Sequence, residues 1–510
     1  AASRLFAADA VLWGPEAESE AAVRLGWIDA PAHAGPLVAE ITELRDALRA
    51  RGISRFVLCG MGGSSLAPEM MTAAAGVALT VLDSTHPAQV RETLSAPLAE
   101  TVAVFSSKSG STVETLSHHL VFRAAFAAAG VDPAEHIVIV TDPGSPLQAL
   151  AEEHGYRVFL ADPNVGGRYS ALTAFGLVPA GLAGADIAQL TAEAGSVRDL
   201  LARDEPENPA LLLAAALCQG VPERPALFLI AGADAGSGLG DWIEQLVAES
   251  TGKHGLGVLP VVLGRDDPEA APAAPALAGL RAWLPPHAPA PAPAEAALAG
   301  PLGAQLLLWE TATALAGVLL GTNPFDQPDV ERAKIAARAA LSGEDTDDAD
   351  DAARPLPVSA LADGPLADLL ASIPPHGYLA VQAYLPELTG AAGERLTAAL
   401  HELRRALFLA GGRTVTLGQG PRFLHSTGQF HKGGPETGAF LQLLDRPEPD
   451  LDVPGTDYSF GELLQAQASG DAAVLRAHGL PVFRVRLGDP LADVAALTAL
   501  AESLARGRAS

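Results

Sequence analysis

Short apolar runs alternate with longer amphipathic stretches along the first 180 residues, and this alternation limits the folds that the chain can adopt. The runs are rich in β-branched and aromatic residues and are bounded by turn residues, which is typical of strands. They are Arg55–Cys59, Ala78–Leu82, Val102–Phe105, Ile137–Val140 and Arg157–Leu160. Strands and helices that alternate at this spacing predict a parallel sheet with helices on both faces.

The same α/β pattern returns in the middle of the chain. Strands are expected at Ala226–Ala231 and Val258–Leu263, with a helix from about Trp242 between them. A further helix is expected at Leu302–Leu319. The most apolar stretch, Leu306–Leu320, is expected to be a buried helix and not a membrane span, because it is short and carries Glu310.

A third region runs from Tyr378 to about Leu504, with strands at Tyr378–Ala383 and Val482–Leu487 and a helix at Gly393–Ala410. We therefore expect an α/β protein with two doubly wound, parallel-sheet, flavodoxin-like subdomains, residues 1–185 and 186–350. Residues 351–510 should form a C-terminal α/β region that packs on or completes the second subdomain.

Two segments have compositions that argue against a packed core. Asp267–Gly300 is dominated by Ala and Pro and is expected to be an exposed linker or a degenerate loop. The acidic run Glu344–Asp351 lacks the glycine and the distal glutamate of a calcium loop, so we expect a solvated loop.

Charge and cysteine content exclude several classes of protein. The chain has 33 Lys and Arg against 60 Asp and Glu, a net charge of −27, which excludes a protein that coats nucleic acid. Cys59 and Cys218 cannot build a disulfide framework or a thiolate metal site, which indicates a reducing, cytoplasmic environment. The N-terminus lacks an initiator Met and a signal peptide, so we interpret it as a cut inside a longer chain.

Lysine is rare in this chain, and arginine supplies most of the cations. The lysines are Lys108, Lys253, Lys334 and Lys432, all in Gly- or Ser-rich or motif-like surroundings and none in an expected ordinary helix. Because an ammonium group is a compact point charge that a planar guanidinium cannot replace, these positions are candidates for functional sites.

Two loops that follow expected strands have the composition of an anion site. Gly60–Ser65 (GMGGSS) leads into a helix, although it is neither a dinucleotide fingerprint nor a nucleotide P-loop. In Ser106–Thr115 (SSKSGSTVET), residues 106–112 place five hydroxyl residues, a lysine and a glycine at the start of the next helix. Hydroxyl groups, backbone N–H groups and a helix N-terminus together predict a cradle for one phosphoryl group.

These loops resemble the sugar isomerase (SIS) domain, and further motifs resemble phosphoglucose isomerases. The similar segments are Gly166–Thr173 (GGRYSALT), Glu249–Lys253 (ESTGK), Asn323–Pro328 (NPFDQP) with Lys334, and Gly420–Pro435 (GPRFLHSTGQFHKGGP). The last is most similar to the isomerase half of bacterial bifunctional transaldolase/phosphoglucose isomerase fusions, which implies an N-terminal transaldolase half as a partner in the native chain.

The resemblance implies interconversion of glucose 6-phosphate and fructose 6-phosphate through a cis-enediolate, with no metal or redox cofactor. It assigns the base to Glu249, charge stabilisation to Arg168, and ring opening to His425 with Lys334. It also implies substrate binding by Gly63, Ser64, Ser107, Lys108, Ser109, Thr112, Gly167 and Gln327. Lys253 and Lys432 receive no role.

Alternatives remain at this point. A dual phosphoglucose/phosphomannose isomerase has the same motifs, whereas a non-catalytic SIS module that binds sugar phosphates needs the cradle but neither Glu249 nor Arg168. His425 follows the other motifs in the chain and must fold back to reach them, so His431 and His254 are competing candidates, ranked in that order. Oligomeric state is left open.

Overall fold

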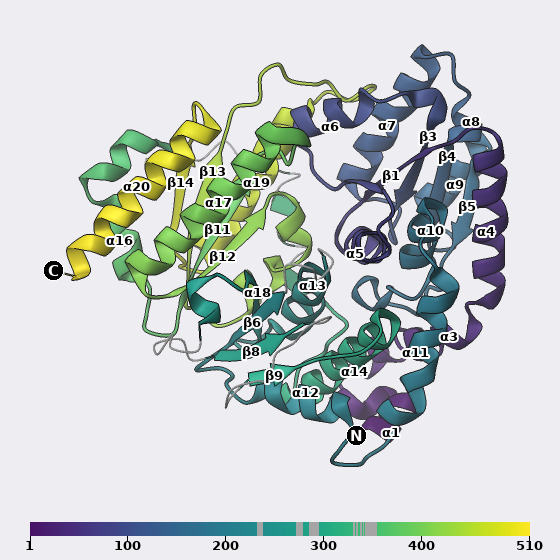
Figure 1. Ribbon diagram of the computed structural model, residues 1–510, viewed down its shortest axis with the longest axis horizontal. Coiled ribbons are helices and arrows are strands. Elements are labelled where there is room, and N and C mark those ends of the chain that lie inside the picture. The colour runs from purple at the N-terminus through teal and green to yellow at the C-terminus, as the bar shows by residue number, and fades with distance from the viewer. Residues whose placement is uncertain are drawn as a thin grey trace.

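The computed structural model describes residues 1–231, 238–271, 279–284, 295–329, 332, 335, 336, 339, 341 and 354–509. Three parallel sheets organise these residues (Figure 1). The first has the order β2-β1-β3-β4-β5, the second β7-β6-β8-β9 and the third β10-β14-β13-β11-β12. The expected α/β class with parallel sheets is confirmed, while the boundaries between the three parts stay a prediction.

The first sheet is buried on both faces. Its strands are β1 Arg55–Gly60, β2 Thr80–Leu82, β3 Thr101–Ser106, β4 Ile137–Thr141 and β5 Arg157–Leu160. Side chains that alternate along β1 enter different cores: Phe56 and Leu58 join one cluster, and Val57 and Cys59 join the other. This is why residues Phe56–Cys59 of the strand form a continuous apolar run.

Helices cover both faces of the first sheet. The helices of this part are α1 Ala2–Phe6, α2 Glu18–Ala21, α3 Ala30–His33, α4 Gly35–Ala50, α5 Leu66–Ala75, α6 Pro87–Leu94, α7 Val113–Ala128, α8 Pro133–His136, α9 Pro146–His154 and α10 Ala174–Ala183. Phe122 and Phe126 of α7 pack on one face, and Phe175 of α10 on the other.

The second sheet contains β6 Ala226–Ala231, β7 Leu259–Gly264, β8 Gly279–Trp283 and β9 Glu295–Ala297. Its helices are α11 Ile187–Leu201, α12 Pro209–Cys218, α13 Leu239–Thr251 and α14 Leu302–Leu320. By length and composition α14 could cross a membrane, but 78% of its apolar window is buried inside the fold. It therefore packs as the core helix that the sequence predicted.

The expectation of an exposed linker at Asp267–Gly300 is wrong for its described parts. Strand β8 pairs in parallel with β6, and β9 pairs with β8. Asp267 and Glu269 are buried because Arg404 reaches both carboxylates, at 2.8 and 2.5 Å. A composition that cannot form its own core is ordered here by pairing with an existing sheet edge. The acidic run Glu344–Asp351 lies outside the described residues.

The C-terminal region forms the third sheet, from β10 Leu356–Pro357, β11 Tyr378–Tyr384, β12 Thr414–Gln419, β13 Gly438–Leu444 and β14 Val482–Arg486. Its helices are α16 Pro365–Ser372, α17 Gly390–Gly411, α18 Gly428–Gly433, α19 Phe460–Ala477 and α20 Pro490–Ala509. Lys432, which was expected in motif-like surroundings outside the ordinary helices, lies in the six-residue helix α18.

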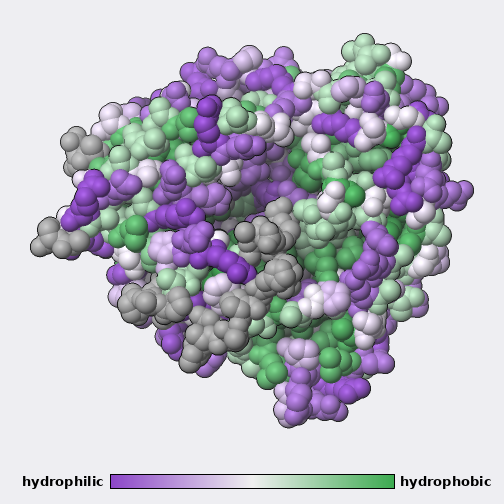
Figure 2. All heavy atoms as spheres, viewed as in Figure 1, coloured by the Kyte–Doolittle hydropathy of each residue, from purple (hydrophilic) through white to green (hydrophobic). Residues whose placement is uncertain are grey.

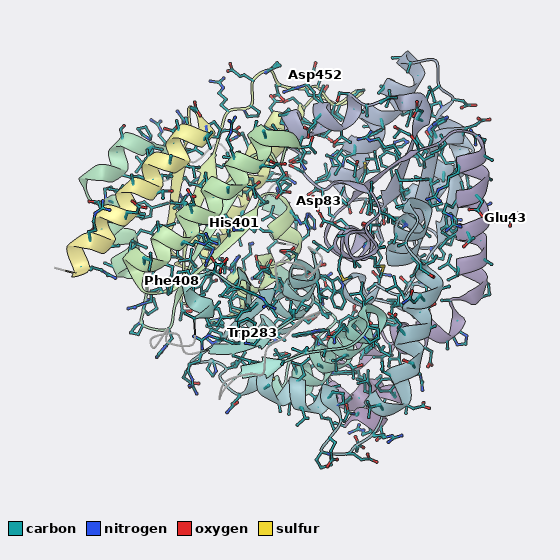
Figure 3. All side chains as sticks on the ribbon, viewed as in Figure 1. Glu43, Asp83, Trp283, His401, Phe408 and Asp452 are labelled. Carbon is teal, nitrogen blue, oxygen red and sulfur yellow. The ribbon has the colours of Figure 1, made fainter. Side chains whose placement is uncertain are left out.

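The second and third sheets share a core. Phe228 of β6 and Val261 of β7 join one cluster with Tyr378 of β11 and Phe440 of β13. In Figure 1 the first sheet stands to the right of the molecule and the third to the left. Figure 2 shows a hydrophilic hollow between them, and the labelled Asp83 and His401 flank it in Figure 3.

Candidate active site

Eleven of the twelve expected site residues line one cavity of about 330 Å³. They are Gly63, Ser64, Ser107, Lys108, Ser109, Thr112, Gly167, Arg168, Glu249, Gln327 and His425. The twelfth, Lys334, lies outside the described residues. The cavity lies where β1 and β3 end, which is where parallel sheets bind ligands.

The hydroxyl-rich loop after β3 is pre-organised by its own hydrogen bonds. Ser107 Oγ and Thr112 Oγ1 lie 2.9 Å apart, and Gly110 N–H donates to Ser107 Oγ at 3.2 Å. The loop leads directly into the N-terminus of α7, which stabilises an anion. Lys108 Nζ lies 2.5 Å from Asp142 Oδ2. Burial raises the pKa of Asp142, and Lys108 opposes that rise.

The glycine loops are in contact with each other. A Cβ atom on Gly63 would lie 2.2 Å from the carbonyl oxygen of Gly167, a distance that no side chain tolerates. Gly62 has a φ of +55°, which favours glycine. The GMGGSS and GGRYS segments therefore need glycine in order to bring Ser64 and Arg168 to the same cavity.

Arg168 and Glu249 form a buried ion pair, with 3.1 Å between Nη1 and Oε1. The other guanidinium donors are also used: Nε donates to Ser250 Oγ at 3.1 Å, and Nη1 to Gln327 Oε1 at 2.6 Å. Nη2 donates to the carbonyl oxygens of Pro324 and Asp326. This planar set of donors ties the GGRYS, ESTGK and NPFDQ segments together, which a lysine could not do.

Three further side chains, Gln245, Glu114 and Gln467, hold Glu249 and His425 in place, and none of the three was expected as a site residue. Gln245 lies one turn before Glu249 on α13, and its Nε2 donates to Glu249 Oε2 at 3.2 Å and to the carbonyl oxygen of His425 at 2.7 Å. The i,i+4 spacing from Glu249 was the signal that could have found it. Glu114 accepts from His425 Nε2 at 3.1 Å, and Gln467 Nε2 donates to Glu114 at 2.7 Å.

The competing histidines lie elsewhere in the described part of the chain. His431 is buried, its Nδ1 lies 2.9 Å from the Tyr378 hydroxyl, and burial lowers its pKa to about 3. His254 lines a separate cavity with Lys253 and Lys432. Of the three, His425 is the one that shares a cavity with Glu249.

The two unassigned lysines hold buried segments in place. Lys253 Nζ donates to the carbonyl oxygens of Ser250 and Asn323 and lies 3.0 Å from Asp326 Oδ1. Burial, together with the nearby Arg168, lowers the pKa of Lys253 to about 8. Lys432 pairs with Asp471 at 2.6 Å, and both are buried. Among the described residues no group of three or more His, Cys, Asp or Glu is arranged to hold a metal ion.

Residues 46–254 match the phosphoglucose isomerase family. A probable glucose-6-phosphate isomerase of Natronomonas pharaonis is 38% identical over 213 residues, which are 41% of this chain and 50% of that protein. The glucose-6-phosphate isomerase of Thermus thermophilus is 37% identical over 244 residues, 45% of this chain and 56% of that protein. The chain thus spans about half the length of the curated relatives it matches.

Solved structures with a related fold cover more of the chain. A hypothetical protein of Thermus thermophilus superposes with a TM-score of 0.56 at 29% identity, over 62% of this chain and 90% of that one. A glucose-6-phosphate isomerase from Chlamydia trachomatis gives a TM-score of 0.54 at 20% identity, over 62% and 74%. The latter similarity concerns the fold alone.

Proposed function

We propose that this protein is an aldose–ketose isomerase that interconverts glucose 6-phosphate and fructose 6-phosphate through a cis-enediolate. The observation that supports this most is that Glu249, Arg168 and His425, from three separate segments, line one cavity with the hydroxyl-rich loop. A carboxylate, a fixed cation and a titratable imidazole beside a phosphate cradle are the groups that such a reaction needs.

The proposed mechanism begins with binding. Ser107, Lys108, Ser109 and Thr112 hold the 6-phosphate at the N-terminus of α7, and Ser64 and Gln327 bind sugar hydroxyl groups. His425, with Lys334, moves protons between the ring oxygen and O1 to open the ring. These assignments follow the resemblance residue by residue.

Proton transfer between C1 and C2 is assigned to Glu249. Its two oxygens are oriented by different donors, Oε1 by Arg168 and Oε2 by Gln245, so that the carboxylate is held in one rotamer. Arg168 then stabilises the negative charge that develops on O1 and O2, because its guanidinium already lies in the buried wall of the cavity.

A coupled assay tests the proposal. The purified chain should convert fructose 6-phosphate to glucose 6-phosphate, detected with an NADP-dependent dehydrogenase. Mannose 6-phosphate supplied as the substrate tests the dual-specificity alternative. An enzyme that also isomerises mannose 6-phosphate must accept the C2 epimer of glucose 6-phosphate in the same pocket. Binding of fructose 6-phosphate without turnover would instead support a non-catalytic sugar-phosphate module.

We also propose that the chain is the isomerase half of a transaldolase fusion and acts in the cytoplasm. The Gly420–Pro435 segment supports the first part, because it is similar to the corresponding segment of such fusions. Two free thiols, Cys59 and Cys218, are consistent with a reducing compartment.

A further inference from the structure

A chain of buried hydrogen bonds extends from His425 into the C-terminal region. His425 Nε2 lies 3.1 Å from Glu114 Oε1, and the same oxygen accepts from Gln467 Nε2 at 2.7 Å. Thr85 Oγ1 donates to Gln467 Oε1 at 2.7 Å. Glu114, Gln467 and Thr85 are 4%, 3% and 0% exposed. This series of hydrogen bonds joins α7, α19 and the loop after β2, which are up to 382 residues apart in sequence.

The chemistry of the groups fixes the direction of these bonds. An ionised carboxylate only accepts, so Gln467 must turn its NH2 group toward Glu114 and its carbonyl toward Thr85. For the same reason His425 must carry a proton on Nε2, which leaves the lone pair of a neutral imidazole on Nδ1. The hydrogen bond of one ring nitrogen thus sets the function of the other.

We propose that Gln467 is a positioning residue, which holds the Glu114 carboxylate in the rotamer that orients His425. This inference rests on the proposed function, because it concerns the group assigned to ring opening. The C-terminal region then contributes twice to the position of the His425 imidazole. The turn after β12 carries His425, and helix α19 supplies the Gln467 amide that orients Glu114, the hydrogen-bond partner of His425.

Charged groups also lie on the elements that pack against this series of hydrogen bonds. Glu249 of α13, Arg168 of the GGRYS turn and Lys108 of the phosphate loop line the same cavity as His425. Arg422 lies on the same turn as His425 and pairs with Glu69 and Asp83. His118 lies one turn after Glu114 and is buried, with a pKa lowered by burial to about 4. None of these groups changes in the variants below.

The first test follows the tautomer of the His425 imidazole and does not depend on turnover. Gln467→Met keeps the length of the side chain but removes the amide, so the Glu114 carboxylate is less well fixed. In ¹⁵N NMR of the neutral imidazole we expect the chemical shifts of Nδ1 and Nε2 of His425 to move toward each other, because the tautomer with the proton on Nε2 is no longer favoured by a fixed acceptor. Thr85→Val, which leaves the amide but frees its carbonyl, should give a smaller shift in the same direction and serves if Gln467→Met does not fold.

The matched control is Gln465→Met on the same helix. Gln465 Nε2 donates to the carbonyl oxygen of Asp445 and not to Glu114, so the ¹⁵N chemical shifts of His425 should stay at their wild-type values. Equal shifts in the Gln465 and Gln467 variants, or no shift in Gln467→Met and Thr85→Val, would overturn the proposal.

Kinetics give the second test. In Gln467→Met, kcat on cyclic fructose 6-phosphate should fall by about 10- to 100-fold, the range that outer hydrogen-bond partners contribute, while inhibition by inorganic phosphate is unchanged. In a His425→Ala background the same substitution should have less than about a 2-fold effect, because the group it positions is gone. A full additional loss would show that Gln467 acts structurally. A wild-type chain without isomerase activity would refute the proposed function, but the NMR measurement of the His425 tautomer would still decide this inference.

Discussion

The guanidinium of Arg168 lies 3.1 Å from the carboxylate of Glu249 although both side chains are more than nine-tenths buried. Burying a charge pair is costly unless further hydrogen bonds satisfy both groups. Here Ser250, Gln327 and two carbonyl oxygens satisfy the guanidinium, and Gln245 satisfies the second carboxylate oxygen. The pair is therefore held rigidly at the cavity, which is what a base and a charge-stabilising group require of each other.

Glu249→Gln should lose most of its turnover but should still bind ligands in the site. The amide keeps the shape and can still accept a hydrogen bond from Arg168, but it has no basicity, so kcat should fall by about 10²- to 10⁴-fold or more. A phosphate-bearing competitive inhibitor should bind as it does to the wild type. If solvent deuterium still enters C2 of glucose 6-phosphate at the wild-type rate, the base is a different group.

This variant also needs a stability control. Arg168 loses its ionic partner in the buried wall, and removing one member of a buried pair commonly costs about 3–5 kcal/mol. The folded fraction of Glu249→Gln should therefore be measured by circular dichroism at the assay temperature, and kcat should be corrected for it.

The phosphate loop is tested by Lys108→Ala combined with Thr112→Val. Lys108 supplies the point charge and Thr112 a hydroxyl at the start of α7, so their loss weakens substrate and transition state alike. KM for fructose 6-phosphate should rise strongly with a smaller change in kcat, and inorganic phosphate should inhibit less. Lys108→Ala also unpairs Asp142, so Asp142→Asn serves as the control. An unchanged KM in the double variant would remove the loop from the binding site.

Much of this site could be predicted because its signals are local. The serines of the phosphate loop, Lys108 and the glycine pairs are adjacent in sequence, and the ends of parallel strands bring such loops together. Gln467 could not be found in this way, since its contact with Glu114 spans 353 residues and depends on how α19 packs.

The strands, too, could be predicted only where the signal in the sequence is local. β1 to β7 lie close to their expected positions, because each carries its own apolar run. β8 and β9 lie in Ala- and Pro-rich sequence and owe their order to pairing with β6, and β12 and β13 were not expected at all. In these strands the tertiary partner outweighs the intrinsic preference of the sequence.

The free energy of unfolding should depend on pH because of Glu244. This residue lines a cavity outside the candidate active site together with Asp241, Glu387 and Arg422. Burial, reinforced by Asp241, raises the pKa of Glu244 from 4.5 to about 8. Between these values the folded chain holds a proton that the unfolded chain releases. The free energy of unfolding should therefore fall as pH rises from about 4.5 to 8, by at most about 1.4 kcal/mol per pH unit for this group.

Glu244→Gln should flatten that decline in urea unfolding between pH 5 and 8.5. Some slope should persist below pH 7, because burial also raises the pKa of Glu387 to about 7. Glu448→Gln, at a side chain that is 77% exposed, is the matched control and should leave the pH profile unchanged. An identical slope in wild type and Glu244→Gln would mean that Glu244 is ionised in the folded chain.

The last prediction separates ring opening from proton transfer. The His425 imidazole lines the cavity with Glu249 but contacts Glu114, whereas the Glu249 carboxylate is paired with Arg168. The two side chains have different partners and can therefore be removed one at a time. His425→Ala should lose most activity on cyclic glucose 6-phosphate, because no imidazole then serves the ring oxygen. It should retain much more activity on an open-chain aldose phosphate, for which ring opening is not required, whereas Glu249→Gln should lose activity on both substrates. The control is His254→Ala, at a histidine that lines a different cavity, and it should behave as the wild type does. Near-native activity of His425→Ala on the cyclic sugar, with a loss in His254→Ala, would move ring opening to the other cavity and leave the turn after β12 with a structural role only.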